Sequence, residues 1–176
     1  NYFSNFNTST AIPSTMINIY YMDARSVPSF LWTEVPKSII IDSNVFNGLS
    51  AAAMGGHMIQ AIGLSLCEGV VVSNNIFRNV GVGNTNDASA CIGIHDCKNI
   101  IVSSNHITSI GGCGISINGT VDTVNINNNQ IVEDVGAVTI PNFGIHFQKI
   151  GSRPSVVATN VMVSNNIIQA ALASIR

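Results

Sequence analysis

Ionisable side chains are sparse in this chain, and several that could do chemistry lie in segments without a strand-like pattern. Asp87 lies in "GVGNTNDASA" (81–90), and Glu133 and Asp134 lie in "VEDVGAVTIPNF" (132–143). Hydrolysis of a glycosidic bond uses two carboxyl groups about 5 to 9.5 Å apart. Asp87 with Glu133 or Asp134 could supply that pair, so these three carboxylates are catalytic candidates.

A second chemistry is open to the same segments. β-Elimination needs a base and a cation that stabilises the negative charge developing on the substrate. The candidate cations are Lys98, Lys149 and Arg153, and His57 is a further ionisable group in "NGLSAAAMGGHMIQA" (47–61). These combinations form no known motif, so the residues do not choose between the two reactions.

These segments must be held in place by a repeated strand pattern. Five segments align on one asparagine: "IIIDSNVF", "VVVSNNIF", "IIVSSNHI", "VNINNNQI" and "VMVSNNII". The aligned asparagines are Asn44, Asn75, Asn105, Asn129 and Asn166. Successive asparagines are 31, 30, 24 and 37 residues apart. Internal repeats of this length are typical of solenoid architectures. An asparagine at each corner tolerates left-handed backbone and can hydrogen-bond to its counterpart one coil further on.

Within each repeat the apolar residues alternate with period two, which indicates strand. In "NIIVSSN", Ile100 and Val102 point to one side and Ile101 and Ser103 to the other. A second strand aligns upstream, as "GLSL" (63–66), "GIHD" (93–96), "GISI" (114–117) and "GIHF" (144–147). One repeat cannot bury its apolar face alone, but successive repeats stacked with their strands about 4.8 Å apart would bury it. The pattern therefore predicts an all-β fold, a parallel β-helix of about five to six coils.

The pattern "GI-x-I…N-I-x-I-x-x-N-x-I", with asparagine at the tight bend, resembles the right-handed, single-stranded parallel β-helix of pectate-lyase-like proteins. The resemblance covers residues 30–170. That superfamily includes pectate lyases, polygalacturonases, alginate-modifying enzymes and phage tailspikes, so it implies a polysaccharide partner and a place outside the cell or on a virion surface. The paired aspartates and GHG element of polygalacturonases, the calcium-binding aspartates of pectate lyases and the YGFDPH element of alginate epimerases are absent.

In polysaccharide-active members of this fold the sugar chain lies along the outer face of the first strand. By resemblance, His95 and His146 are candidate substrate contacts, aligned in one outward column and two coils, about 10 Å, apart. The alternative is that both are ordinary polar residues on an exposed strand. The predicted substrate-binding set is Ser65, His95, Ser116, His146 and Lys98.

Asp96 aligns with the apolar residues Leu66, Ile117 and Phe147. A carboxylate at a core-facing position would be costly unless it is hydrogen-bonded or its pKa is shifted. Asp96 is therefore either a turn residue past the strand end, in "DCK", or a functional carboxylate beside His95. The predicted catalytic set is Asp87, His95, Asp96, Glu133 and Asp134.

Composition narrows the function classes. Charged residues make up 9% of the chain, against roughly 25% in ordinary globular proteins, and the net charge is −2. No basic stripe favours nucleic acid, and no apolar run reaches the roughly 20 residues of a membrane span. The four cysteines include no CxxC pair, so neither a metal site nor a cofactor is expected. Cys67 and Cys97 fall in one column on neighbouring coils, and free thiols are expected there.

A stripe of apolar residues follows the outward side of the second strand: Ile40, Val71 and Ile101, continued by Asn125 and Met162. Contiguous exposed apolar residues commonly mark interfaces. Either a segment of the chain such as "FLWTEVP" (30–36) covers the stripe, or a symmetric partner does, as in trimeric phage tailspikes.

The chain is expected to form one domain over 1–176, with an irregular first coil over 1–36 and regular coils over 37–172. Both ends fall in mid-coil in the alignment, so the chain is expected to be part of a larger protein or assembly. Two functions stay open. One is a carbohydrate-engaging domain that binds and cleaves an extracellular polysaccharide, and the other is a non-catalytic scaffold or adhesin segment.

Overall fold

A computed structural model describes residues 1–4, 14–20, 35–48, 59–81, 89–108, 110–132, 143–148, 157–169 and 173–175. These residues form strands and turns, and none of them belongs to a helix that could cross a membrane. The strands lie in three parallel sheets, each named here after its first strand. The all-β prediction is therefore confirmed.

Each sheet takes every third strand of the chain. The β1 sheet holds β1 (Tyr2–Ser4), β4 (Val45–Asn47), β7 (Ile76–Arg78), β10 (His106–Thr108), β13 (Gln130–Val132) and β16 (Ile167–Gln169). The β2 sheet holds β2 (Ser14–Tyr20), β5 (Ile59–Ser65), β8 (Ala90–His95), β11 (Cys113–Asn118), β14 (Phe143–Gln148) and β17 (Ala173–Ile175). The β3 sheet holds β3 (Lys37–Asp42), β6 (Glu68–Ser73), β9 (Lys98–Ser103), β12 (Thr120–Asn127) and β15 (Val157–Ser164).

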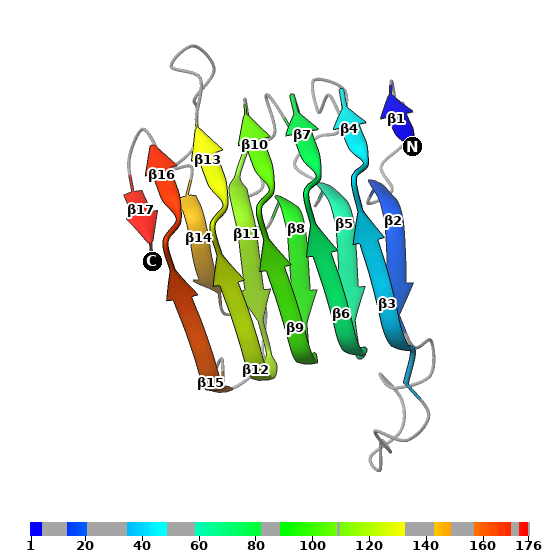
Figure 1. Ribbon diagram of the computed structural model, residues 1–176, viewed down its shortest axis with the longest axis vertical. Coiled ribbons are helices and arrows are strands. Elements are labelled where there is room, and N and C mark those ends of the chain that lie inside the picture. The colour runs from blue at the N-terminus through cyan, green and yellow to red at the C-terminus, as the bar shows by residue number, and fades with distance from the viewer. Residues whose placement is uncertain are drawn as a thin grey trace.

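This order describes a parallel β-helix, as the repeat predicts. In Figure 1 the chain runs up the near β3 sheet and continues into the β1 sheet at the top. It then returns down the far β2 sheet and moves from right to left with each coil. That path is right-handed. Strands β1 and β2, which lie in the stretch predicted to be irregular, pair in parallel with β4 and β5 and extend the same sheets.

The five aligned asparagines form a continuous hydrogen-bonded ladder at the corner between the β3 and β1 sheets. From Asn75 onward, each Oδ1 accepts the backbone N–H and the Nδ2 of the asparagine one coil earlier, at 2.9 to 3.1 Å. Asn1 takes the same place before the first full coil and donates its Nδ2 to Asn44 Oδ1 at 3.0 Å. Buried amides are costly unless they are paired, and stacking on an identical amide satisfies each of them. The predicted asparagine contact between coils is confirmed.

The left-handed backbone lies one residue earlier than predicted. The residues with positive φ, from 53° to 56°, directly precede the ladder asparagines: Ser43, Asn74, Ser104, Asn128 and Asn165. The ladder asparagines themselves lie outside the left-handed region. The reason is that the preceding residue makes the bend, which frees the next amide to point into the coil and meet its neighbour.

The core lies between the three sheets and consists of stacked columns of identical or similar side chains. In the β2 sheet one column is Ile17, Ile62, Ile92, Ile115 and Ile145. In the β1 sheet the rings of Phe46 and Phe77 stack with centroids 4.8 Å apart and planes 5° apart. Parallel in-register pairing brings like side chains together, so residues about 30 apart in the chain form one packed core.

Candidate functional site

The outer side of the β2 sheet carries most of the described candidate residues. In β5, Ala61 and Ile62 both pack in the core, whereas the buried polar residue Gln60 is not part of it. A Cβ on Gly93 would collide with the Gln60 amide, so this glycine leaves the room that the amide occupies. We call the following outward side chains the outer face: Gln60, Ser65, His95, Cys113, Ser116, Asn118, Phe143 and His146.

The prediction that the histidines and serines of this face form a single column is wrong. Ser65 pairs with His95 and Ser116 pairs with His146, as predicted. However, His95 pairs with Asn118, because β8 and β11 align two residues away from the predicted register. The two histidines are therefore two strands apart and in different columns. A slip of two residues keeps every apolar side chain inward, so the alternation does not detect it.

His95 pairs with a residue that the sequence reasoning missed. The Gln60 Nε2 lies 2.9 Å from His95 Nε2, and Gln60 is buried although it lies on the outer face. A glutamine N–H donates, so His95 Nε2 is the acceptor of a neutral imidazole in this arrangement. The signal in the sequence was the lone polar residue in the apolar run "MIQAIGL".

Asn118 is the second residue that the sequence reasoning missed. Its Nδ2 donates to Ser116 Oγ at 3.1 Å, and its side chain is 3% exposed. Its Oδ1 is buried and meets no hydrogen-bond donor in the part of the chain that the structure describes. Most buried polar atoms are paired, so an unpaired buried amide oxygen is a feature that needs an explanation.

His146 sits in an apolar setting on the same face. Its ring lies against Phe143, with centroids 4.5 Å apart, and its Nδ1 is 3.5 Å from Cys113 Sγ. All three side chains are buried. This packing differs from the polar surroundings of His95, so the two predicted contacts lie in unlike environments.

Asp96 lies in the turn after β8, one of the two positions that the sequence left open. Its backbone is left-handed, with φ of 51°, and its Oδ1 accepts the Thr120 N–H at 2.8 Å. A Cβ on Gly119 would collide with that carboxylate, so Gly119 gives it room. The stretch between the paired parts of β11 and β12, which contains Thr120, is one residue longer than the stretch between the paired parts of β8 and β9. Asp96 satisfies the N–H that this insertion introduces.

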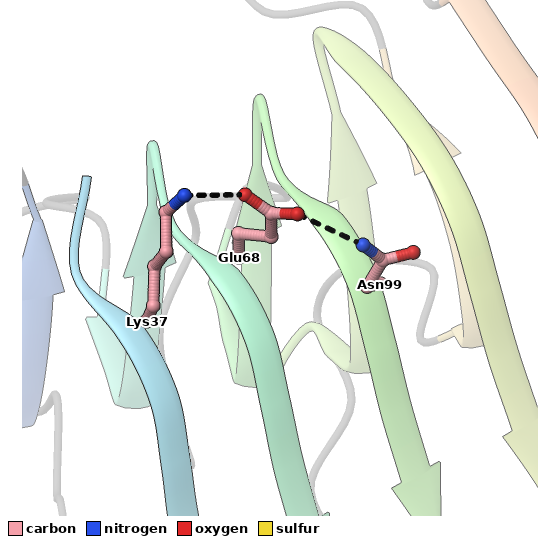
Figure 2. Close-up of polar contacts among 3 residues, drawn as sticks. All are labelled: Lys37, Glu68 and Asn99. Carbon is pink, nitrogen blue, oxygen red and sulfur yellow. Dashed lines mark hydrogen bonds and ion pairs between the residues drawn. The ribbon is translucent and has the colours of Figure 1, made fainter. Parts of the chain in front are cut away.

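Lys98 begins β9 on the β3 sheet, away from the outer face. Its column alternates in charge along Lys37, Glu68, Lys98 and Asp122. Lys37 Nζ lies 3.3 Å from Glu68 Oε2, and Asn99 Nδ2 donates to Glu68 Oε1 at 3.1 Å. Figure 2 shows Lys37 and Asn99 on opposite sides of Glu68. Hydrogen bonds from Thr159 and Asn160 lower the pKa of Asp122, and the charge of Lys98 lowers it further.

The remaining candidate groups are not part of the described structure. Asp87, Glu133, Asp134, His57, Lys149 and Arg153 lie outside the described residues. Among the residues that are described, no group of three or more His, Cys, Asp or Glu side chains could hold a metal ion.

The cysteines are free thiols and buried, as predicted for Cys67 and Cys97. Their sulfur atoms lie 3.4 Å apart on neighbouring coils, and Cys97 Sγ donates to the His95 carbonyl at 3.1 Å. The hydrogen bond to Cys97 and burial raise the pKa of Cys67 well above its usual range. This pair packs directly behind the strand end that carries His95.

The predicted apolar stripe is present on the β3 sheet in the predicted order. Ile40, Ile101 and Met162 are 73%, 40% and 53% exposed, and Val71 and Asn125 are half-buried. These side chains are exposed among the residues that the structure describes. The sequence suggested the segment 30–36 as a cover, and residues 30–34 of it lie outside the described residues.

Comparisons with known proteins found no match among family models, curated proteins or solved structures. The fold assignment therefore comes from the strand pairing itself. The likeness to pectate-lyase-like proteins stays a prediction about ancestry and activity.

Proposed function

We propose that the outer face of the β2 sheet engages an extracellular polysaccharide, outside the cell or on a virion surface. The observation that carries the proposal is the buried Asn118 Oδ1, which meets no hydrogen-bond donor in the described residues, beside the His95–Gln60 pair. Polysaccharides present many hydroxyl groups, each able to donate and accept. A rigid row of amide, imidazole and hydroxyl groups suits them, because binding sites fix a ligand through a few well-placed polar groups.

Binding is the part of this proposal that the described residues support. Cleavage by hydrolysis or β-elimination would need Asp87, Glu133 or Asp134, which lie outside the described residues. Glycoside hydrolysis takes two carboxyl groups at a set separation. The described carboxylate nearest to His95 in sequence is Asp96, and it holds the Thr120 N–H.

The test offers the protein a panel of neutral and acidic polysaccharides. Binding is measured by affinity electrophoresis, and cleavage by new reducing ends and by the ultraviolet absorbance of unsaturated products. His95→Ala should weaken binding of the preferred polymer by up to about tenfold, which corresponds to one lost hydrogen bond. His106→Ala is the matched control, because His106 also pairs with a glutamine, at 3.0 Å, but on the β1 sheet. Equal losses in the two variants would count against the outer face.

A second candidate function is a scaffold or adhesin segment without a carbohydrate site. The continuous asparagine ladder favours it, since the ladder alone explains the repeat. In that case no polysaccharide binds and none is cleaved, although the purified chain is folded by circular dichroism. Product formation lost in Asp87→Ala would instead support an enzyme.

We also propose that further copies of the chain cover the stripe of Ile40, Val71 and Ile101, in a homotrimer. Exposed apolar side chains gain about 25 cal/mol for each Å² removed from water, and the alternating charges beside the stripe leave little net repulsion. Light scattering should give three chains for the wild type and one for Ile40→Lys with Ile101→Lys. Ile167→Lys, at an equally exposed isoleucine on the β1 sheet, should stay trimeric. A monomeric wild type would refute this assembly.

A further inference from the structure

The Asn118 amide retains an unpaired atom whichever way it is oriented. In the structure Nδ2 donates to Ser116 Oγ and Oδ1 meets no donor in the described residues. If the amide were turned over, Oδ1 would accept from the Ser116 hydroxyl and Nδ2 would lack an acceptor. The single hydroxyl of Ser116 serves one of the two atoms at a time. The unmet hydrogen bond is therefore a property of the site.

An unmet hydrogen bond in a buried amide destabilises the fold unless something else satisfies it. The ladder asparagines show the contrast, because their amides are paired with the next coil. Asn118 stands in a different column, opposite His95 of β8. A partner that arrives from outside the chain would complete its hydrogen bonding.

The surroundings of Asn118 define the charge of that partner. The four strands that carry the outer face, β5, β8, β11 and β14, contain neither lysine nor arginine. In the arrangement shown, His95 Nε2 accepts a hydrogen bond from Gln60 Nε2. The one carboxylate that adjoins His95 in the chain is Asp96. An anionic ligand would find no cation here among the described residues, and it would meet the negative charge of Asp96.

Among the described residues, the edge of the outer face that reaches solvent nearest to Asn118 is at His95. Asn118 is 3% exposed, and Ser116 beside it is fully buried. Ser65, His95 and Asp96 are half-buried and mark the edge where the outer face reaches solvent. Asn118 Oδ1 is itself shielded from solvent, so a ligand group entering at this edge would have to displace the half-buried His95 side chain to reach it.

We propose that His95 and Asn118 form a subsite for a neutral sugar residue, with one sugar hydroxyl hydrogen-bonded to the unpaired Asn118 atom. A hydroxyl both donates and accepts, so it satisfies the amide in either orientation. Among the residues that the structure describes, a uronate carboxylate would lack a counterion there. The subsite therefore selects neutral polysaccharides over acidic ones. This inference rests on the proposed function.

The test is Asn118→Leu in the full chain, measured for both binding and stability. Leucine has the same branched arrangement of side-chain heavy atoms, with methyl groups in place of the amide oxygen and nitrogen, so it removes the unmet hydrogen bond. The preferred neutral polymer is chosen among dextran, galactomannan and mixed-linkage glucan. We expect Asn118→Leu to bind it at least tenfold more weakly than the wild type does. The unfolding midpoint of the variant should be equal to or above that of the wild type. The wild type should bind polygalacturonate and alginate at least tenfold more weakly than that polymer.

Asn127→Leu is the matched control on the β3 sheet. Its amide is paired, because Nδ2 donates to Asn125 Oδ1 at 2.8 Å and Oδ1 accepts from Asn128 Nδ2 at 3.0 Å. This variant should keep the binding affinity and lower the unfolding midpoint.

Two kinds of failure can be told apart. If the wild type binds no polysaccharide, the proposed function and the subsite both fall. If it binds acidic polymers as well as neutral ones, or if Asn118→Leu binds normally, only the subsite falls. A larger loss of stability in Asn118→Leu than in Asn127→Leu would also overturn it, since Asn118 would then be structural.

Discussion

Replacing Asn105 by alanine would test whether the asparagine ladder holds the coils together. The Asn105 amide makes four hydrogen bonds of 3.0 Å: Oδ1 accepts from Asn75 N and Asn75 Nδ2, and Nδ2 donates to Val72 O and Asn129 Oδ1. The residue is buried, so water does not replace them. Each hydrogen bond contributes about 0.5 to 1.5 kcal/mol net, so Asn105→Ala should cost about 4 kcal/mol.

That cost is large against the roughly 5 to 15 kcal/mol that stabilises a folded domain. The assay is urea unfolding followed by circular dichroism at the strand band. With a slope of about 2 kcal/mol per molar urea, the midpoint should fall by about 2 M. Asn127→Ser is the control, because the same column carries serine at Ser73, Ser103 and Ser164, and it should change stability by less than about 0.5 kcal/mol.

The reasoning fails if Asn105→Ala unfolds within about 1 kcal/mol of the wild type at an unchanged slope. The ladder would then be a by-product of stacking, and the apolar columns alone would hold the register. A changed slope would instead show that the coils no longer unfold as one unit.

Three further outcomes follow from the described contacts. Phe77→Ala should cost about 3 to 5 kcal/mol in urea unfolding, because it empties a buried site stacked on a second ring; a cost below about 1 kcal/mol would refute the packing. Hydrogen bonds lower the pKa of Asp42 and of Asp122 in the folded state. The stability that these two carboxylates contribute should therefore be fully present above the unfolded pKa of about 3.9, and it should be lost as the pH falls through the lower folded pKa. In the double variant Asp42→Asn, Asp122→Asn, the unfolding free energy should depend less on pH in the acid range. An unchanged pH dependence would exclude these carboxylates as its cause. The thiols of Cys67 and Cys97 should react with a thiol reagent only after urea unfolding, because both are buried; rapid labelling of the native protein would contradict their burial.

Much of the fold was predictable because one local pattern repeats. The period-two alternation indicated strands, and the aligned asparagines located each corner between the β3 and β1 sheets. The structure confirms both, including the order of the stripe from Ile40 to Met162. Strands β1 and β2 were harder to predict, since the stretch 1–36 carries the pattern only weakly.

Less of the candidate site was predictable, because it depends on contacts between coils. The pairing of His95 with Asn118 instead of Ser116 requires the register of β8 on β11. The Gln60 amide fits beside His95 only because Gly93, 33 positions later in the chain, has no side chain in the space that the amide occupies. Neither relation produces a local pattern in the sequence.

The sequence by itself determined which residues face the core and where each coil turns, because alternation and the corner asparagine are local and repeat in every coil. Only the tertiary structure decided which outward residues become neighbours. A shift of two residues between coils leaves the buried pattern intact, so the apolar core accepts either register. Here the turns after β5, β8 and β11 select one register, with Leu66, Asp96 and Gly119 all left-handed and stacked. That stacking places Asn118 beside His95 and leaves its amide with an unmet hydrogen bond.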